Sequence, residues 1–216
     1  MPEGLPRFSQ RDRLLLMGSC FATNIGARLV EAKFACDVNP YGVLYNPLSL
    51  SAALREAMDG KVYAEGDLYA YGGLWHSPMH HGDFSAPTAG EALARIRARL
   101  EALQAELAGL DALVLTWGTA WVYEDAQTGR IVGNCHKRPE RCFRRRRLTV
   151  EEVTADWLDL IGALRARNPR LRVLVTVSPI RHIRDGLHAN QLSKATLLLA
   201  ADALVEALPD VVGYFP

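Results

Sequence analysis

The sequence has few cysteines, little net charge and no long apolar run. The 216 residues include four cysteines, and no two lie at zinc-knuckle spacing. A chain of this length needs no disulfides for stability. A formal net charge of +1 provides no general attraction to nucleic acid or to a membrane surface. The apolar stretches are too short to span a bilayer, and the first residues lack the basic start and apolar segment of a signal peptide. We therefore expect a cytoplasmic protein that has no membrane partner.

The composition is that of a folded globular protein. Hydrophobic residues make up 49% and charged residues 23% of the chain, which excludes an extended disordered polymer. A length of 216 residues suits one domain with a sizeable core, and we treat residues 1–216 as a single domain.

Strand-like and helix-like patterns alternate along the chain, which is typical of an α/β fold with a mostly parallel sheet. Strands are predicted at 14–17, 111–116, 171–177 and 211–215, and a short piece at 36–38 leads into a loop that contains proline and glycine. Helices are predicted at 23–33, 48–58, 91–107, 149–167 and 191–208. A hairpin is predicted from 121–124 and 130–132, and a partly extended loop at 63–81. Because a parallel strand normally packs under a following helix, the last strand predicts a domain truncated at its C-terminus.

Polar residues follow three of the predicted strands, at 18–20, 118–121 and 178–188. Parallel strands bring their carboxyl ends to one edge of a sheet, so a serine, a glycine-containing loop and histidines can meet there. Ser19 would stand at a helix N-terminus, where unpaired backbone N–H groups attract an anion. Serine is also a favoured helix cap, but the convergence of the three segments favours Ser19 as a nucleophile.

Residues 18–22, Gly-Ser-Cys-Phe-Ala, resemble the signature of the GSCFA family, which groups with the SGNH (GDSL-like) hydrolases. The similarity extends through four further motifs at 39–47, 118–121, 134–137 and 178–182. The resemblance implies a three-layer α/β/α sandwich of flavodoxin-like type. It also implies a serine hydrolase or acyltransferase that acts on an ester-linked acyl group and requires no metal or organic cofactor. The implied partner is a small-molecule or carbohydrate ester.

The resemblance further implies that Ser19 is the nucleophile and that backbone N–H groups near it and at Gly42 form the oxyanion hole. A tight turn is an equally good reason for the glycine at position 42. The superfamily's Gly-x-Asn motif is incomplete here, because Gly118 is not followed by an asparagine two residues later. Asn46 or Asn134 is a substitute donor, or each holds its own loop, as asparagines in turns usually do.

The general base has two possible origins. Asp185 and His188 have the Asp-x-x-His spacing of the superfamily, which lets a carboxylate orient an imidazole. In the superfamily this motif follows the last core strand, whereas here a helix and a strand still follow it. We therefore expect the base beyond Pro216, with His182 and His188 as residues of the pocket. His182 has the additional support of the family-like pair Arg181-His182.

Three further cationic residues are candidates to bind an anionic part of the substrate or to polarise its carbonyl group: Arg181, Lys137 and His136. Surface salt bridges are the ordinary role of such side chains. Cys20 is a minor alternative nucleophile. The histidines of the 76–81 segment have no set of metal ligands around them, so we expect them to be hydrogen bonded or solvated rather than metal-bound.

Two other functions compete with hydrolysis. The same pocket could bind a carbohydrate or an anion without turnover. Separately, the basic run Arg141 to Arg147, with four consecutive arginines, could contact the phosphate backbone of a nucleic acid. A solvated basic loop is the commoner origin of such a run, and nucleic acid is not an expected partner.

Overall fold

The computed structural model describes residues 7–181 and 183–216. Its centre is a five-stranded sheet in the order β10-β9-β5-β1-β2, and all four neighbouring pairs are parallel. These strands are β1 (Arg13–Gly18), β2 (Ala35–Val38), β5 (Ala112–Trp117), β9 (Arg172–Val177) and β10 (Val212–Phe215). Numbered by their own chain order, the five run 2-1-3-4-5, the flavodoxin-like order. The predicted α/β fold with a parallel sheet is confirmed.

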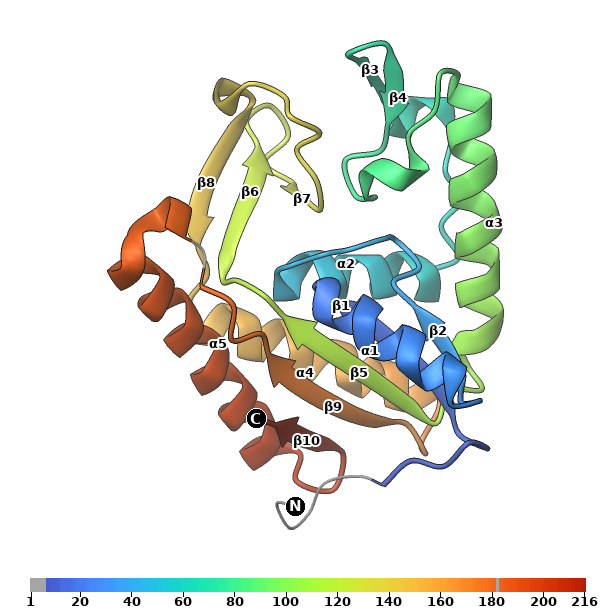
Figure 1. Ribbon diagram of the computed structural model, residues 1–216, viewed down its shortest axis with the longest axis vertical. Coiled ribbons are helices and arrows are strands. Elements are labelled where there is room, and N and C mark those ends of the chain that lie inside the picture. The colour runs from blue at the N-terminus through green and yellow to red at the C-terminus, as the bar shows by residue number, and fades with distance from the viewer. Residues whose placement is uncertain (1–6, 182) are drawn as a thin grey trace.

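Helices cover both faces of this sheet (Figure 1). They are α1 (Cys20–Glu31), α2 (Pro47–Met58), α3 (Ala89–Leu107), α4 (Val150–Arg167) and α5 (Gly186–Ala207). Successive side chains of a strand point to opposite faces. Leu14 and Leu16 of β1 accordingly pack with Ala22 of α1, whereas Leu15 and Met17 join the core shared by the other four helices. The result is a three-layer sandwich.

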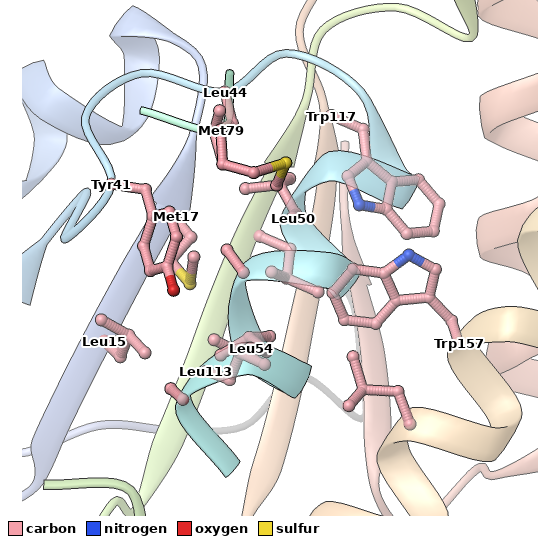
Figure 2. Close-up of a cluster of buried hydrophobic side chains, with 14 of the residues drawn as sticks. Leu15, Met17, Tyr41, Leu44, Leu50, Leu54, Met79, Leu113, Trp117 and Trp157 are labelled. Atoms are coloured by element: carbon pink, nitrogen blue, oxygen red, sulfur yellow. The ribbon is translucent and has the colours of Figure 1, made fainter. Parts of the chain in front are cut away.

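The larger core lies between the sheet and the helices α2 to α5. Figure 2 shows Leu15 and Met17 in one cluster with Leu54 of α2, and the indole rings of Trp117 and Trp157 next to each other at one side of it. The centroids of these two rings are 5.8 Å apart. Full burial of a side chain of this kind stabilises a fold by about 1.5–3 kcal/mol, so the apolar face of the sheet is the main source of stability.

The chain signals the starts of two helices directly. Thr149 caps α4, and Glu152 completes the capping box by accepting a hydrogen bond from the Thr149 N–H at 2.8 Å. Asn46 caps α2, with Pro47 as the first helical residue. A cap satisfies N–H groups that have no partner inside the helix, which explains why both helices begin where the sequence predicts.

Two small antiparallel sheets accompany the central one. One consists of β3 (Tyr69–Tyr71) and β4 (Leu74–His76), and the other, the β6–β8 sheet, of β6 (Trp121–Asp125), β7 (Ile131–Val132) and β8 (Phe143–Arg147) in the order β7-β6-β8. Four single turns of 3-10 helix lie at Glu65–Asp67, Gly82–Phe84, Glu140–Cys142 and Ile183–Asp185. The predicted hairpin at 121–132 is confirmed, and the segment expected as a loop at 63–81 contains the β3–β4 pair.

The β6–β8 sheet extends beyond the carboxyl end of β5 (Figure 1) as an excursion between β5 and α4. Its ends meet, because the Leu148 N–H donates to the Ala120 carbonyl oxygen at 2.8 Å. The arginine run within this excursion is a strand and not the solvated loop that we expected. Residues 143–147 pair with 121–125 in antiparallel register, and most of their side chains find partners on one face or the other, as described below.

In the described residues, no helix combines the length and the apolar character needed to cross a membrane. The helix α5 begins at Gly186, five residues before the predicted start. The residues 186–190 therefore lie within a helix and not in a free loop.

Candidate functional site

The carboxyl ends of β1 and β5 form the topological switch point of the sheet. From β1 the chain continues to β2 on one side, and the strand on the other side of β1 is β5. Open α/β sheets bind their ligands outside such a point, where two loops part in opposite directions. Ser19 follows β1 and Gly118 follows β5, so both lie at this position, as the sequence predicts.

Ser19 stands between the last residue of β1 and the first residue of α1. Its Oγ accepts a hydrogen bond from the Phe21 N–H at 3.3 Å, and its own N–H donates to the Thr116 carbonyl oxygen at 3.2 Å. Within 7–181 and 183–216 the Cys20 N–H has no acceptor. Ser19 is 2% exposed and Cys20 is exposed. The hydroxyl thus caps the helix while one unengaged N–H donor lies beside it.

Gly18 allows β1 to end so close to its neighbour. Its φ of 142° is rarely adopted by residues with a side chain, and an added Cβ would overlap the carbonyl group of Thr116. The Gly18 N–H donates to Asn39 Oδ1 at 2.8 Å, and Asn39 Nδ2 donates to Thr23 Oγ1 at 2.9 Å. The backbone that presents Ser19 is therefore fixed by β5 on one side and by the loop after β2 on the other.

Gly42 does not supply the oxyanion donor that the resemblance implies. Its N–H donates to the Asn39 carbonyl oxygen at 2.7 Å, which engages the only donor of this residue. Its φ is 74°, and an added Cβ would overlap the Cβ of His81. The alternative role, a glycine of a tight turn, accounts for these contacts.

The segment that leads into α2 crosses the ends of both strands. The Tyr45 carbonyl oxygen accepts hydrogen bonds from the N–H groups of Gly118 and Thr119 at 2.7 and 3.0 Å, and the Leu44 N–H donates to Gly18 at 3.1 Å. Gly118 thus belongs to the site, but its N–H is not available to an oxyanion. The Tyr45 side chain is 42% exposed, and burial together with the nearby Cys20 thiol raises its pKa.

The two candidate asparagines hold local structure. Asn46 is 6% exposed and its Oδ1 accepts from the Ser49 N–H at 2.8 Å, as a helix cap. Asn134 Oδ1 accepts from the His136 N–H at 2.8 Å, which closes a turn. The structural role weighed for each asparagine accounts for these contacts, and the Asn46 amide nitrogen is also engaged, since it donates to Ser49 Oγ at 2.9 Å.

Two residues of α5 contact the Gly118 turn although the sequence did not single them out. Ser193 Oγ accepts a hydrogen bond from the Ala120 N–H at 2.8 Å. Lys194 Nζ donates to the Gly118 carbonyl oxygen at 2.5 Å, and burial lowers the pKa of this lysine to about 8. The sequence contained a signal for Ser193. Asn190 and Ser193 lie on the same buried stripe of α5 as Leu197, and apolar residues are the rule at such positions.

Asp185 and His188 do not form a dyad in this structure. Asp185 Oδ1 forms an ion pair with Arg145 Nη2 at 2.7 Å, and its side chain is 9% exposed. His188 lies exposed in the first turn of α5, and no hydrogen bond joins it to Asp185. Because α5 begins early, the carboxylate faces the β6–β8 sheet. Arg181 is exposed, and the candidate His182 lies outside the described residues.

The remaining cationic candidates join two segments of the chain. His136 Nε2 bonds with the Ser77 carbonyl oxygen at 2.9 Å, and burial lowers the pKa of this histidine. Lys137 is exposed and its carbonyl oxygen accepts from the Tyr71 hydroxyl at 3.5 Å. Both residues therefore connect the β6–β8 sheet to the β3–β4 segment.

The histidines of the 76–81 segment are hydrogen bonded, as expected. His76 Nδ1 bonds with Ser85 Oγ at 2.7 Å, and His80 Nδ1 with Ser77 Oγ at 2.8 Å. The His80 ring stacks on Tyr41 at 4.2 Å, and burial lowers its pKa to about 3. In the part of the chain that the structure describes, no three metal-binding side chains gather at one place.

The basic run is largely neutralised within the protein. Arg144 and Arg146 form ion pairs with the buried Glu124 at 2.5 and 2.6 Å, and their hydrogen bonds lower the pKa of that carboxyl group. On the opposite face Arg145 pairs with Asp185 and lies 4.3 Å above the Trp121 ring. Three of the four consecutive arginines thus have internal partners, which leaves little of the charge that phosphate contacts require.

A cavity of about 710 Å³ lies away from the strand ends, between α2, the 61–69 segment and the turn between β6 and β7. Its lining includes cationic and anionic side chains that pair with one another, such as Arg55 with Asp156 at 3.2 Å and Lys61 with Asp67 at 3.2 Å. Ser19 is not among the lining residues, so this cavity is separate from the switch-point site.

Comparison with known proteins gives one match. The sequence model of the GSCFA family matches residues 13–216, a range that contains all five central strands and the whole switch-point site. No curated protein and no solved structure matches the chain.

Proposed function

The chain belongs to the GSCFA family, and from this premise we propose that it is a serine hydrolase or acyltransferase in which Ser19 attacks an ester-linked acyl group. The observation that carries the proposal is the position of Ser19 at the switch point, beside the unengaged Cys20 N–H at the start of α1. A nucleophile needs such a neighbour, because donors aimed at the developing oxyanion are worth about 3–4 kcal/mol each in acyl transfer. The motifs that resemble those of the GSCFA family, which groups with the SGNH hydrolases, support the same chemistry.

In the proposed reaction the Ser19 hydroxyl oxygen bonds to the ester carbonyl carbon and its proton passes to a histidine. Within this chain the candidates are His182 and His188. The carbonyl oxygen becomes an oxyanion, which the Cys20 N–H and the positive end of α1 stabilise. The C–O bond to the alcohol then breaks, the alcohol takes the proton, and an acyl-enzyme remains. Water resolves this ester in a hydrolase, and an acceptor hydroxyl does so in a transferase.

Access to Ser19 involves its neighbours. The serine is 2% exposed, so an ester reaches the hydroxyl only when adjacent side chains move. Tyr45 and Cys20 are the exposed neighbours at the mouth of the site. Movement of such side chains on binding is common even where the backbone stays in place.

A second candidate function is binding of an anion or a carbohydrate at the same place without turnover. It is favoured by one observation, the ion pair of Asp185 with Arg145, because that pair keeps the carboxylate from orienting a histidine. The helix N-terminus and the Cys20 N–H would serve a bound anion equally well.

Covalent labelling separates the two functions. The full chain is treated with a fluorophosphonate probe, which modifies activated serines, and we expect one label per chain on Ser19. Ser19→Ala should abolish labelling and Cys20→Ala should retain it. Ser19→Asn is the matched control for the fold, because asparagine is as good a helix cap as serine but is no nucleophile. Absence of labelling in the folded parent protein would show that Ser19 is not activated within residues 1–216 and would favour the binding function for this chain.

A further inference from the structure

Lys194 is a partly buried cation at the switch-point site that lacks an anionic partner. Its Nζ donates to the Gly118 carbonyl oxygen at 2.5 Å, and no carboxylate of residues 7–181 or 183–216 forms an ion pair with it. Burial lowers its pKa to about 8. Withdrawal of an ammonium group from water without a counter-ion is unfavourable, so this arrangement costs stability, and a functional role of the charge would explain why it is present.

Several other partly buried cations have the carboxylate partner that Lys194 lacks. Lys61 pairs with Asp67 at 3.2 Å and with Glu56 at 3.5 Å. Arg99 pairs with Asp37 at 2.7 Å, and Arg145 pairs with Asp185. Arg165 resembles Lys194 in donating only to a backbone carbonyl oxygen, that of Pro169, but it lies near the C-terminal end of α4, whereas Lys194 contacts the turn that follows β5.

That place is the same strand end that holds Ser19. The Ser19 N–H donates to the carbonyl oxygen of Thr116, and Lys194 donates to that of Gly118, two residues further along the chain. Two residues of extended backbone span about 7 Å. A compact molecule of a few bonded atoms can therefore present one group to Ser19 and another to Lys194.

The charges around Lys194 favour an anion there. Asp185, which ends the 3-10 turn before α5, is neutralised by Arg145. Arg181, which follows β9 at the same sheet edge, is exposed and adds positive charge. The start of α1 contributes a partial positive charge through its dipole.

We propose that Lys194 binds a carboxylate or phosphate group of the substrate, so that the ester attacked by Ser19 is an anionic one. The inference that the bound anion is part of an ester rests on the proposed function, whereas the binding of the anion does not require turnover. An ammonium group binds such an anion by a charge-assisted hydrogen bond. On binding, Lys194 either gives up its hydrogen bond to the Gly118 carbonyl oxygen or keeps it alongside the bond to the anion.

The first test measures binding in Ser19→Ala, which cannot turn over. Calorimetry compares monomethyl succinate, which carries a carboxylate, with dimethyl succinate, its neutral counterpart, and 2-acetoxyethyl phosphate tests a phosphate. We expect at least one anionic probe to bind about 10- to 100-fold more tightly than the neutral one, as a hydrogen bond to a charged group predicts. The anion that binds more tightly identifies the natural group. If neither anion binds more tightly than dimethyl succinate, the proposal is wrong.

Variants locate the effect. In the Ser19→Ala background, Lys194→Met should abolish the preference for the anion and Lys194→Arg should retain part of it. Lys33→Gln is the matched control for net charge, because Lys33 precedes β2 and so lies at the opposite edge of the sheet. Loss of the preference in the Lys33 variant, or its survival in Lys194→Met, would assign the binding to general charge and overturn the proposal.

The second test measures turnover in the parent chain, with 4-nitrophenyl hemisuccinate and 4-nitrophenyl butyrate as anionic and neutral esters. Lys194→Met should lower the ratio of kcat/KM for the hemisuccinate to kcat/KM for the butyrate about 10- to 100-fold. An equal loss for both esters would contradict an anion-binding role and indicate a general effect on the chemistry. Should neither ester be hydrolysed while the binding preference stands, the hydrolase proposal fails and the anion site remains.

Discussion

The central sheet and the β6–β8 sheet are held together by different forces. Leu15 and Trp117 of the central sheet are fully buried among apolar side chains (Figure 2). The β6–β8 sheet has only Val122 and Val132 as buried apolar side chains, and it is otherwise fixed by Glu124 between two arginines and by Arg145 over an indole ring.

The difference indicates which parts of the molecule depend on apolar burial and which depend on directional bonds. Apolar burial is non-directional and tolerates repacking, so it fixes the sheet without specifying what lies at its edge. Ion pairs and hydrogen bonds are directional and need each partner. The elements around the switch point, which Arg145 and Asp185 connect, depend on such bonds.

The largest expected effect tests the apolar side of this comparison. Leu15→Ala should lower the free energy of unfolding by about 2–5 kcal/mol, because it leaves a cavity at a fully buried position. The matched control is Leu74→Ala in β4, where the side chain is 38% exposed; it should change the stability by about 0.5 kcal/mol or less. Urea unfolding measures both. Equal losses would remove the distinction between the central and the small sheets.

The next effect tests the polar side. Glu124→Gln removes the carboxylate that accepts from Arg144 and Arg146, and we expect a loss of about 1–3 kcal/mol, because Glu124 is buried but Arg144 is largely exposed to solvent. Glu101→Gln, at an exposed position of α3, is the control and should leave the midpoint of urea unfolding unchanged. A Glu124 variant as stable as its parent would show that the ion pairs do not hold the β6–β8 sheet.

A pH dependence follows from His80 in the polar segment after β4. Burial lowers its pKa from 6.5 to about 3, so between these values the unfolded chain binds a proton that the folded chain does not. Folding stability is therefore fully retained above pH 6.5 and falls with decreasing pH, by about 1.4 kcal/mol per pH unit. In unfolding measured between pH 6 and pH 5, His80→Gln should lower the slope of the parent by about this amount, while the contribution of His136, whose pKa is also lowered by burial, remains. Identical slopes would contradict a neutral, buried His80.

The smallest expected effect distinguishes two roles of Asn46, that of a helix cap and that of an oxyanion donor. Asn46→Ala should lower the stability by about 1 kcal/mol through loss of the α2 cap, whereas Asn46→Asp should keep most of it, since its Oδ1 still accepts from the Ser49 N–H. Neither change should abolish fluorophosphonate labelling, because the Asn46 side chain is engaged with Ser49. Loss of labelling in a folded Asn46→Asp protein would instead support Asn46 as a donor of the oxyanion hole.

The sequence predicts the fold well because its signals are local. The apolar run of β5 lies within a short stretch of chain. The same holds for the N-cap, the capping box and the C-terminal stop signal of α4. Residues 143–147 lack such a signal, since the apolar alternation of a strand is replaced by arginines whose partners, Glu124 and Asp185, lie elsewhere in the chain.

The site was predicted in part. The convergence of Ser19 and Gly118 follows from the parallel order of the strands, and the turn and cap roles of Gly42 and Asn46 follow from local chemistry. Lys194 lies in the middle of a predicted helix, and its bond to Gly118 arises only when α5 packs against the sheet. Contacts of this kind depend on tertiary structure, which no local pattern contains.

The hydrogen bond between Leu148 and Ala120 has a consequence for how this fold can diversify. Since the excursion 121–147 leaves and rejoins the sheet at one point, its removal or enlargement changes the loop-closure entropy only slowly with length and leaves the β5-to-α4 crossover in place. The excursion is thus a segment that can be exchanged by insertion or deletion while the core persists. We expect relatives to differ most in length here, next to the site whose specificity they would thereby alter.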